Sequence, residues 1–382
     1  MEALMSRKLF TLSLTATLMG GTAYADTPQV AVDIAPVHSL VARVMDGVGT
    51  PDLIIQPGAS PHEYSLRPSE AAALQNSDLV FWIGPDLTPW LTDTIETLAK
   101  DASVTTLLDL DGTVQLDFRE SALFEVHDHK DPDDHDDHDD HDDHDDHDDH
   151  DDHDDHDDHD DHDDHDDHDD HDDHDDHDDH DDHDDHDDHD DHDDHDDHDD
   201  HDVTAGHDKH DHGDHDPHAW LSPKNAMTWL NVIAGQLSAV DPDNAGTYFA
   251  NAAAGRTEIE LLIGEVTATL DRVRGGSFIV FHDAYQYFEM DFNFPASGAI
   301  SVSDASDPSP ARITEIRDRI AKQGIDCVLA EPQFNPDLIA TVLDGTDAQT
   351  GILDPLGSDL EPGSSLYHEL IRNMSTALAS CM

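Results

Sequence analysis

The sequence predicts an α/β protein of two lobes with mostly parallel sheets, joined by a long rigid helix. Three observations support this fold class. Short apolar runs alternate with helical patterns in two separate blocks of the chain, as expected for parallel sheets that helices cover on both faces. A long helical pattern at 241–273 lies between the blocks. Outside the charged low-complexity segment about 260 residues are left to fold, enough for two lobes of ordinary size.

The first block contains four apolar runs of strand length, separated by three helical patterns. The strands are expected at 30–35, 51–56, 78–84 and 103–110, and the helices at 36–49, 67–77 and 87–100. The second helix has Pro68 in its first turn, where proline is well tolerated.

The second block repeats this scheme and ends with a helix. Strands are expected at 277–283, 294–301, 326–332 and 350–355, and helices at 284–290, 309–324, 335–345 and 364–380. The pattern at 241–273 begins after Pro242, and a single helix between two lobes would limit large hinge motion.

These patterns divide the chain into six parts. They are a signal peptide at 1–25, the N-terminal lobe at 26–119, a disordered Asp/His-rich loop at 120–216, a return to the N-terminal lobe at 217–240, the linker helix at 241–274 and the C-terminal lobe at 275–382. The signal peptide is expected because Arg7 and Lys8 precede a short apolar run and Ala23-Tyr24-Ala25 resembles a cleavage site. The mature protein is therefore expected in the periplasm.

The chain is strongly acidic, with a formal net charge of −75. Such a surface attracts cations and excludes nucleic-acid binding, which needs a basic patch. Much of the charge comes from 23 consecutive Asp-Asp-His triplets between Asp133 and His201. The repeat has no apolar residue from which to build a core.

Regularly spaced imidazoles among carboxylates suit a flexible ligand for zinc, nickel or copper. A solubilising spacer that arose by triplet expansion is the alternative. The accessory metal-binding histidines begin and end the repeat or flank it: His127, His129, His135, His201, His207, His210, His212 and His215.

Outside the repeat, three histidines and one aspartate form a candidate metal site. His62 follows the second expected strand, and His282 and Asp354 stand at the ends of two others, where open α/β sheets bind ligands. His218 lies just after the repeat. Three imidazoles and one oxygen make a tetrahedral zinc shell. Two lobes that face each other would bring these residues together, so the metal site is expected in the inter-lobe cleft. Glu331, at another strand end, is expected either to hydrogen-bond a ligand or to serve packing.

Several motifs together resemble a known family. They are "PGASPHEYSLRPSEAAALQNSDLVFWIGP", "HAWLSP", "FHDAYQYF", "AEPQF" and "LDPLG". In this order they resemble the zinc-binding substrate-binding proteins of bacterial ABC importers, the cluster A-I or solute-binding protein family 9 group of the ZnuA type. The resemblance implies two lobes bridged by a long helix, with the metal between them.

The resemblance also assigns roles to residues. It implies that His62, His218 and His282 are the imidazole ligands, and that Asp354 is the fourth ligand or lies nearby. Manganese-binding relatives have glutamate in place of His282, so this residue favours zinc. Zinc relatives often have glutamate before the first ligand, where this chain has Pro61.

The only two cysteines, Cys327 and Cys381, favour one disulfide in an exported chain, with two free thiols as the alternative. They also match the disulfide of zinc-specific relatives.

The expected function is capture of periplasmic Zn²⁺ and its delivery to the permease and ATPase of an inner-membrane ABC importer. In this reading the protein is a monomer, zinc is its transported ligand and it performs no catalysis. Three alternatives are a periplasmic metal buffer or detoxification protein, a manganese-binding importer component and a zinc hydrolase. The hydrolase is disfavoured because no HExxH motif occurs.

Overall fold

The computed structural model describes residues 27–119, 124, 215–301 and 308–382. The expected signal peptide and almost all of the expected Asp/His-rich loop lie outside these residues. The described chain contains two four-stranded sheets in which every pair of neighbouring strands is parallel. This confirms the predicted fold class.

The two sheets share one strand order. The first has the order β2-β1-β3-β4, with β1 at Val30–Val32, β2 at Asp52–Leu53, β3 at Leu79–Trp82 and β4 at Ser103–Thr106. The second has the order β6-β5-β7-β8, with β5 at Phe278–His282, β6 at Ala299–Ser301, β7 at Cys327–Ala330 and β8 at Gln349–Ile352. Several strands are shorter than their apolar runs. For example, β2 ends at Leu53, but the next two residues of its apolar run, Ile54 and Ile55, are also buried.

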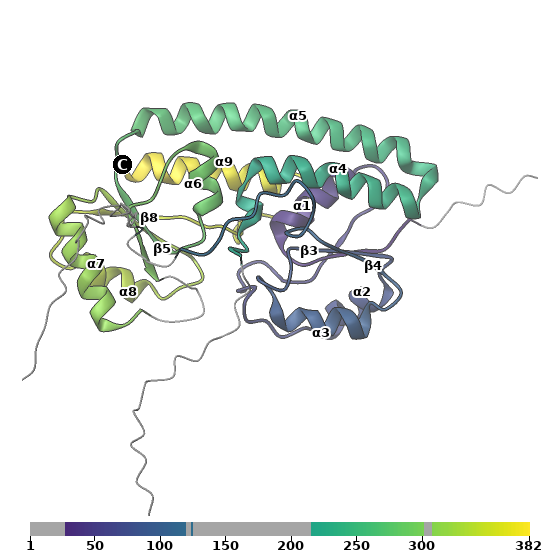
Figure 1. The fold of residues 1–382 in the computed structure, drawn as a ribbon, viewed down its shortest axis with the longest axis horizontal. Helices are drawn as coiled ribbons and strands as arrows, with labels where there is room; N and C mark the ends of the chain where they lie inside the picture. The colour runs from purple at the N-terminus through teal and green to yellow at the C-terminus, as the bar shows by residue number, and fades with distance from the viewer. Residues whose placement is uncertain (1–26, 120–123, 125–214, 302–307) are drawn as a thin grey trace, which may run out of the picture. The chain divides into compact units, whose positions relative to one another are not determined.

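Helices cover both faces of the first sheet (Figure 1). They are α1 at Ala35–Val44 on one face, and α2 at Pro68–Asn76 and α3 at Pro89–Leu98 on the other. Each begins with a proline in its first turn, where its missing N–H has no helical partner to lose. The Glu70 carboxylate accepts a hydrogen bond from the Arg67 backbone N–H at 2.7 Å, which caps α2.

From His215 onward the chain returns to the first lobe. A 3-10 turn at Ala219–Leu221 leads into α4 at Pro223–Val240. The Ser222 hydroxyl accepts a hydrogen bond from the Asn225 N–H and caps α4. The buried side of α4 packs against α1 and α5.

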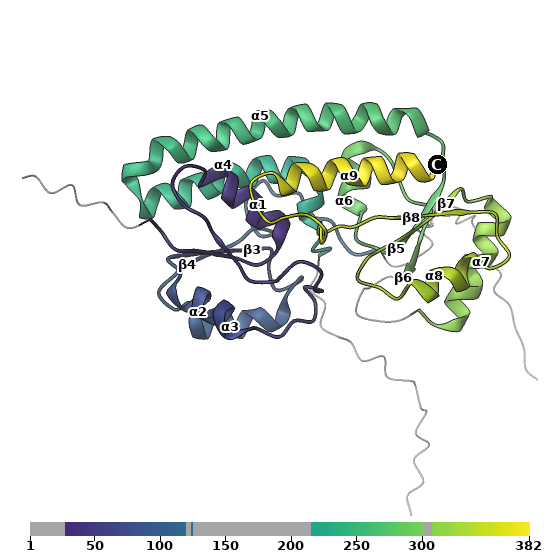
Figure 2. The same cartoon turned by 180° about the vertical axis from the view of Figure 1, so that it is seen from behind.

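The long helix α5, Ala245–Leu270, extends over both lobes (Figures 1 and 2). Short 3-10 turns at Pro242–Asn244 and Asp271–Val273 flank it. Its buried residues recur every three or four positions along the whole helix, so one face is apolar from end to end: Tyr248, Ala252, Gly255, Ile259, Leu262, Val266 and Leu270. At Gly255 a Cβ atom would lie only 3.1 Å from the Leu230 side chain, so glycine allows α4 and α5 to approach closely.

Four helices complete the second lobe: α6 at Gln286–Phe292, α7 at Pro310–Gln323, α8 at Pro336–Leu343 and α9 at Leu366–Cys381. Helices α7 and α8 pack on β6 and β7 over a small separate core. Helix α9 lies along α5 and also contacts α1 and β8. Across the described residues, no helix combines the length and apolar character needed to cross a membrane.

The main hydrophobic core is shared by the two lobes. It contains β1 and β3 of the first sheet, residues of β5 and β7 of the second, and the buried faces of α1, α4, α5 and α9. Opening the lobes like a hinge would expose part of this core to water, at about 25 cal/mol for each Å² of apolar surface. The fold therefore holds the lobes in a nearly constant relation.

A disulfide between Cys327 and Cys381 confirms the predicted pairing. It joins β7 to the last residue of α9, with the two Cα atoms 5.7 Å apart. The bond therefore fastens the C-terminal helix to the second sheet at the end remote from α1.

We expect the Cys327→Ala/Cys381→Ala double variant to unfold more easily than the natural protein. Loss of a bridge between cysteines 54 positions apart should lower the free energy of unfolding by up to about 4 kcal/mol in the chain-entropy model. Urea denaturation of the natural protein, with and without reductant, and of the variant measures this. Equal midpoints in all three samples would contradict the stabilising role.

Candidate metal-binding site

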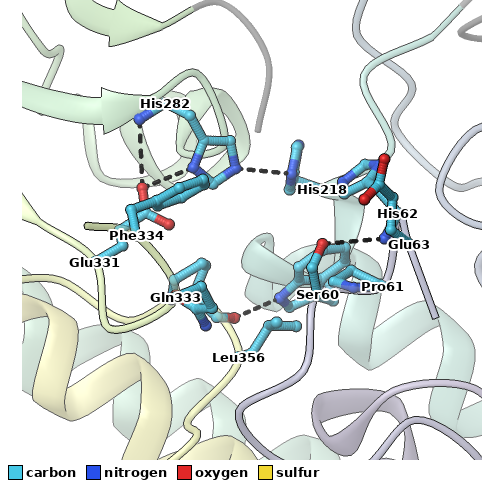
Figure 3. Close-up of a pocket in the computed structure, with 12 residues that line it drawn as sticks. Ser60, Pro61, His62, Glu63, His218, His282, Glu331, Gln333, Phe334 and Leu356 are labelled. Atoms are coloured by element: carbon cyan, nitrogen blue, oxygen red, sulfur yellow. Dashed lines mark hydrogen bonds and ion pairs between the residues drawn. The ribbon is translucent and has the colours of Figure 1, made fainter. Parts of the chain in front are cut away.

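A pocket between the two lobes brings together the three predicted histidines (Figure 3). Ser60, Pro61, His62 and Glu63 reach it from the loop after β2, and His218 and Trp220 from the turn before α4. The second lobe supplies the rest of the lining: His282, Glu331, Gln333, Phe334, Pro355 and Leu356.

His62 lies on a loop that the first lobe anchors on either side. The Trp90 indole N–H donates a hydrogen bond to the Pro61 carbonyl at 2.8 Å, and the Tyr64 hydroxyl donates one to Glu70 at 2.8 Å. The His62 backbone N–H donates to the Ser60 hydroxyl at 3.3 Å. The residue is half-buried, whereas His218 and His282 are buried.

His218 is buried and held by a carboxylate two residues before it. Asp216 Oδ1 lies 2.7 Å from His218 Nδ1 and also accepts the His218 backbone N–H at 3.0 Å. Because a carboxylate accepts at Nδ1, the ring carries its hydrogen there and its lone pair on Nε2. The Asp216 side chain is only 2% exposed, and burial raises its pKa to about 7 despite the opposing effect of nearby hydrogen-bond donors and Arg119.

His282, the last residue of β5, has a matching partner in Glu331. Glu331 Oε1 lies 2.7 Å from His282 Nδ1 and accepts the His282 backbone N–H at 3.3 Å. Burial raises the pKa of Glu331, and the neighbouring His282 opposes this shift. Of the two roles considered for Glu331, the structure shows the hydrogen bond to a candidate ligand.

The spacing of the rings suits a tetrahedral ion. Nε2 of His218 and Nε2 of His282 are 3.4 Å apart. Two nitrogens that each lie about 2.0 to 2.1 Å from a tetrahedral zinc ion are also roughly 3.4 Å apart. The His218 and His282 ring centroids are 5.2 Å apart, whereas those of His62 and His218 are 6.0 Å apart.

Among the described residues, no group of three His, Cys, Asp or Glu side chains stands close enough to hold a metal ion without rearrangement. The His62 ring lies farther from His218 than the His282 ring does. Of the three histidines, His218 and His282 already have the nitrogen spacing that a tetrahedral zinc ion needs.

Asp354 lies beside the pocket and caps the loop that follows β8. Its carboxylate accepts hydrogen bonds from the backbone N–H groups of Leu356, Gly357 and Ser358 at 2.9, 3.0 and 2.6 Å, and from the Ser358 hydroxyl at 2.5 Å. It is absent from the pocket lining. Of the two positions expected for Asp354, this geometry favours a neighbour of the site over the fourth ligand.

Most of the accessory histidines cannot be placed. His127, His129, His135, His201, His207, His210 and His212 lie outside the described residues. His215 is described: it forms an antiparallel bridge with Asp117, and its Nδ1 lies 3.3 Å from Asp117 Oδ1.

The sequence does not single out Asp216, which falls at the end of the expected Asp/His-rich loop. The structure places it buried, with its carboxylate against the His218 ring. A local signal is the sequence motif Asp216-Pro217-His218. An aspartate two residues before a histidine can accept hydrogen bonds from both the ring and the backbone N–H of that histidine.

The fold and the pocket define a two-lobed α/β solute-binding protein. The family model described as zinc-uptake complex component A, periplasmic, matches residues 30–381. Two relatives named high-affinity zinc uptake system protein ZnuA match over almost the whole chain. The one from Brucella abortus (strain 2308) is 41% identical over 367 residues, 96% of this chain and 95% of its own. The one from Paracoccus denitrificans is 42% identical over 361 residues, 94% and 93% of the two chains.

Solved structures support the fold. A crystal structure of ZnuA has a TM-score of 0.61 at 18% identity, covering 93% of this chain and 99% of its own. A periplasmic metal binding protein from Candidatus Liberibacter asiaticus has a TM-score of 0.60 at 16% identity, covering 92% and 99%. The chain belongs to the ZnuA family of zinc-uptake components.

We expect Glu331→Gln to weaken zinc binding roughly 10- to 100-fold, because the partner that orients the His282 ring and raises its basicity is lost. Competition with a chromophoric chelator measures this affinity. Asp241→Asn is the matched control, since Asp241 is equally buried but bonds Asn244 and Tyr248 in the first lobe. An equal loss of affinity in both variants would show that the effect is general.

Proposed function

We propose that the chain is the zinc-capturing component of an ABC zinc uptake system. It binds Zn²⁺ in the periplasm through His62, His218 and His282 and delivers it to the membrane permease. The observation that carries this proposal is the 3.4 Å separation of the His218 and His282 Nε2 atoms, with a buried carboxylate behind each ring. The names of the two relatives that are 41% and 42% identical support it.

The ligand chemistry favours zinc over manganese. Three imidazole nitrogens suit Zn²⁺, whereas Mn²⁺ prefers carboxylate and water oxygens. The carboxylates nearest the rings, Asp216 and Glu331, accept from Nδ1 atoms and so orient the ligands instead of binding the ion directly. A small oxygen ligand, a water molecule or a carboxylate that moves inward, fills the fourth position in this proposal.

We propose a binding role without catalysis. The buried carboxylates that could activate a zinc-bound water are engaged by the histidines they orient. An assay of the zinc-loaded protein against ester and peptide substrates separates this role from that of a hydrolase.

The remaining assignments follow from this role. Residues 1–25 act as a cleaved signal peptide, the mature chain works as a monomer in the periplasm, and its partners are the permease and ATPase of the importer. The Asp/His-rich segment within 120–216 gathers zinc as an accessory to the pocket.

Growth of a strain that lacks the protein tests the function. An importer component is needed when zinc is scarce, so the strain should grow poorly in the presence of a zinc chelator and recover with added zinc. Poor growth only under zinc excess would identify a metal buffer or detoxification protein.

We expect His62→Ala, His218→Ala and His282→Ala each to remove the tight zinc site, because one of three imidazoles is lost. Asp354→Ala should weaken zinc binding less and should mainly destabilise the 355–358 loop that its carboxylate caps. Calorimetric zinc titration measures the affinities, and urea denaturation measures stability. Tight binding that survives in all three histidine variants would disprove the site.

Deletion of Asp133 to Asp202 should leave one tight zinc ion per molecule and remove many weaker ones. Each zinc bound by the repeat needs about four donors, and ordering the chain around it costs about 1–2 kcal/mol per residue. The pocket avoids most of this cost. Calorimetry at low and high salt should show that only the weaker sites depend on salt; loss of the tight site would make the repeat the primary site.

A further inference from the structure

Arg119 lies at the end of the first segment of the first lobe, and its guanidinium contacts residues of the second lobe. Nη2 donates to Glu289 Oε2 at 2.8 Å, and Nε donates to Gln286 Oε1 at 2.9 Å. Nη1 forms an ion pair with Asp283 Oδ1 at 3.4 Å. The arginine also stacks on Phe124, with Cζ 3.8 Å from the ring centroid, and its side chain is 17% exposed.

The backbone around Arg119 is paired with the segment that leads to His218. The Asp216 N–H donates to the Leu116 carbonyl at 2.8 Å, and Asp117 and His215 form an antiparallel bridge. Helix α6 holds both segments, because the Tyr287 hydroxyl accepts the Leu116 N–H at 3.0 Å and donates to the Asp216 carbonyl at 2.8 Å.

Two buried carboxylates at this junction have Arg119 as their opposing charge. Asp283 and Glu289 pair with it directly, with side chains 7% and 6% exposed. Leaving such groups buried without a cation is costly.

The junction adjoins His218 and His282, the two candidate zinc ligands whose Nε2 atoms lie 3.4 Å apart. Asp216 bonds Nδ1 of His218, and Asp283 directly follows His282 in the chain. A change in the place of Arg119 would therefore be passed to both rings, which lie on different segments.

We infer that Arg119 is a positioning residue for the zinc site, holding the His282 corner of the second lobe against the Asp216–His218 segment so that the two Nε2 atoms keep their spacing. This inference rests on the proposed function. A lysine in its place would keep one charge but lose the planar fork that engages Asp283, Gln286 and Glu289 together.

The test compares Arg119→Gln and Arg119→Lys in the full-length chain with Arg43→Gln. Arg43 is a matched control: its side chain is 16% exposed and it pairs with Glu258 between α1 and α5 through two hydrogen bonds of 2.9 Å, remote from the pocket lining. The measurements are zinc affinity by chelator competition, and the visible spectrum of the first Co²⁺ equivalent, which reports ligand geometry independently of stability.

We expect Arg119→Gln to bind zinc about 10- to 100-fold more weakly, the range seen for lost outer-shell partners, and to alter the Co²⁺ spectrum. Arg119→Lys should restore part of the affinity, and Arg43→Gln should change neither measurement. Natural affinity and spectrum in Arg119→Gln would overturn the inference, as would equal losses in Arg119→Gln and Arg43→Gln.

Should Arg119→Gln fail to fold, Arg119→Lys decides: a weakened site with an altered spectrum supports the inference, and natural values reject it. His218→Ala in the same assay separates this inference from the proposed function. If that variant also keeps tight binding, the pocket is not the zinc site at all. If it loses tight binding while the Arg119 variants keep it, only the role of Arg119 is wrong.

Discussion

The two buried imidazoles whose Nε2 atoms lie 3.4 Å apart each have a buried carboxylate at Nδ1, which fixes where the ring carries its hydrogen. Asp216 and Glu331 do this by accepting at Nδ1, so both lone pairs point into the pocket. A carboxylate that accepted a hydrogen bond from Nε2 instead would place the hydrogen on that atom and leave it without a lone pair for a metal. The rest of the architecture brings the two His–carboxylate pairs together, since one belongs to the segment before α4 and the other to the ends of β5 and β7.

The structure around these pairs is packed more tightly between the lobes than at the loop that carries His62. The apolar face of α5, the shared core and the contact of Trp220 with the Pro355 carbonyl at 2.8 Å keep the lobes together. His62 stands on a loop that lines the pocket, and the residue is half-buried. His218 and His282 are buried, so the packing around the three histidines is uneven.

The elements of the fold follow from local patterns, so the sequence predicted them well: apolar runs, prolines in first turns and the three- or four-residue spacing in α5 are all visible in the chain. The strand-end rule and the family resemblance led to His62, His218 and His282, which the structure brings to one pocket. The contacts made by Asp354 and Arg119 could not be predicted from the sequence, whereas the motif around Asp216 held a local signal. Arg119 meets Glu289 across 170 positions, and no spacing rule predicts which carboxylate an arginine will meet at such a separation. For Asp354 the sequence left two positions open, the fourth ligand or a neighbour of the site, because strand ends favour both ligands and caps.

The bridge between Asp117 and His215 has a consequence for how the sequence between them can change. The two ends of that insertion meet at one point on the fold, so the entropy of closing the loop is the main quantity that depends on its length. In the general relation for chain closure, each doubling of loop length costs only about 0.6 kcal/mol. Selection on folding therefore sets no sharp limit on the number of triplets. Copies of this short tandem repeat can accumulate or disappear without redesign of the lobes.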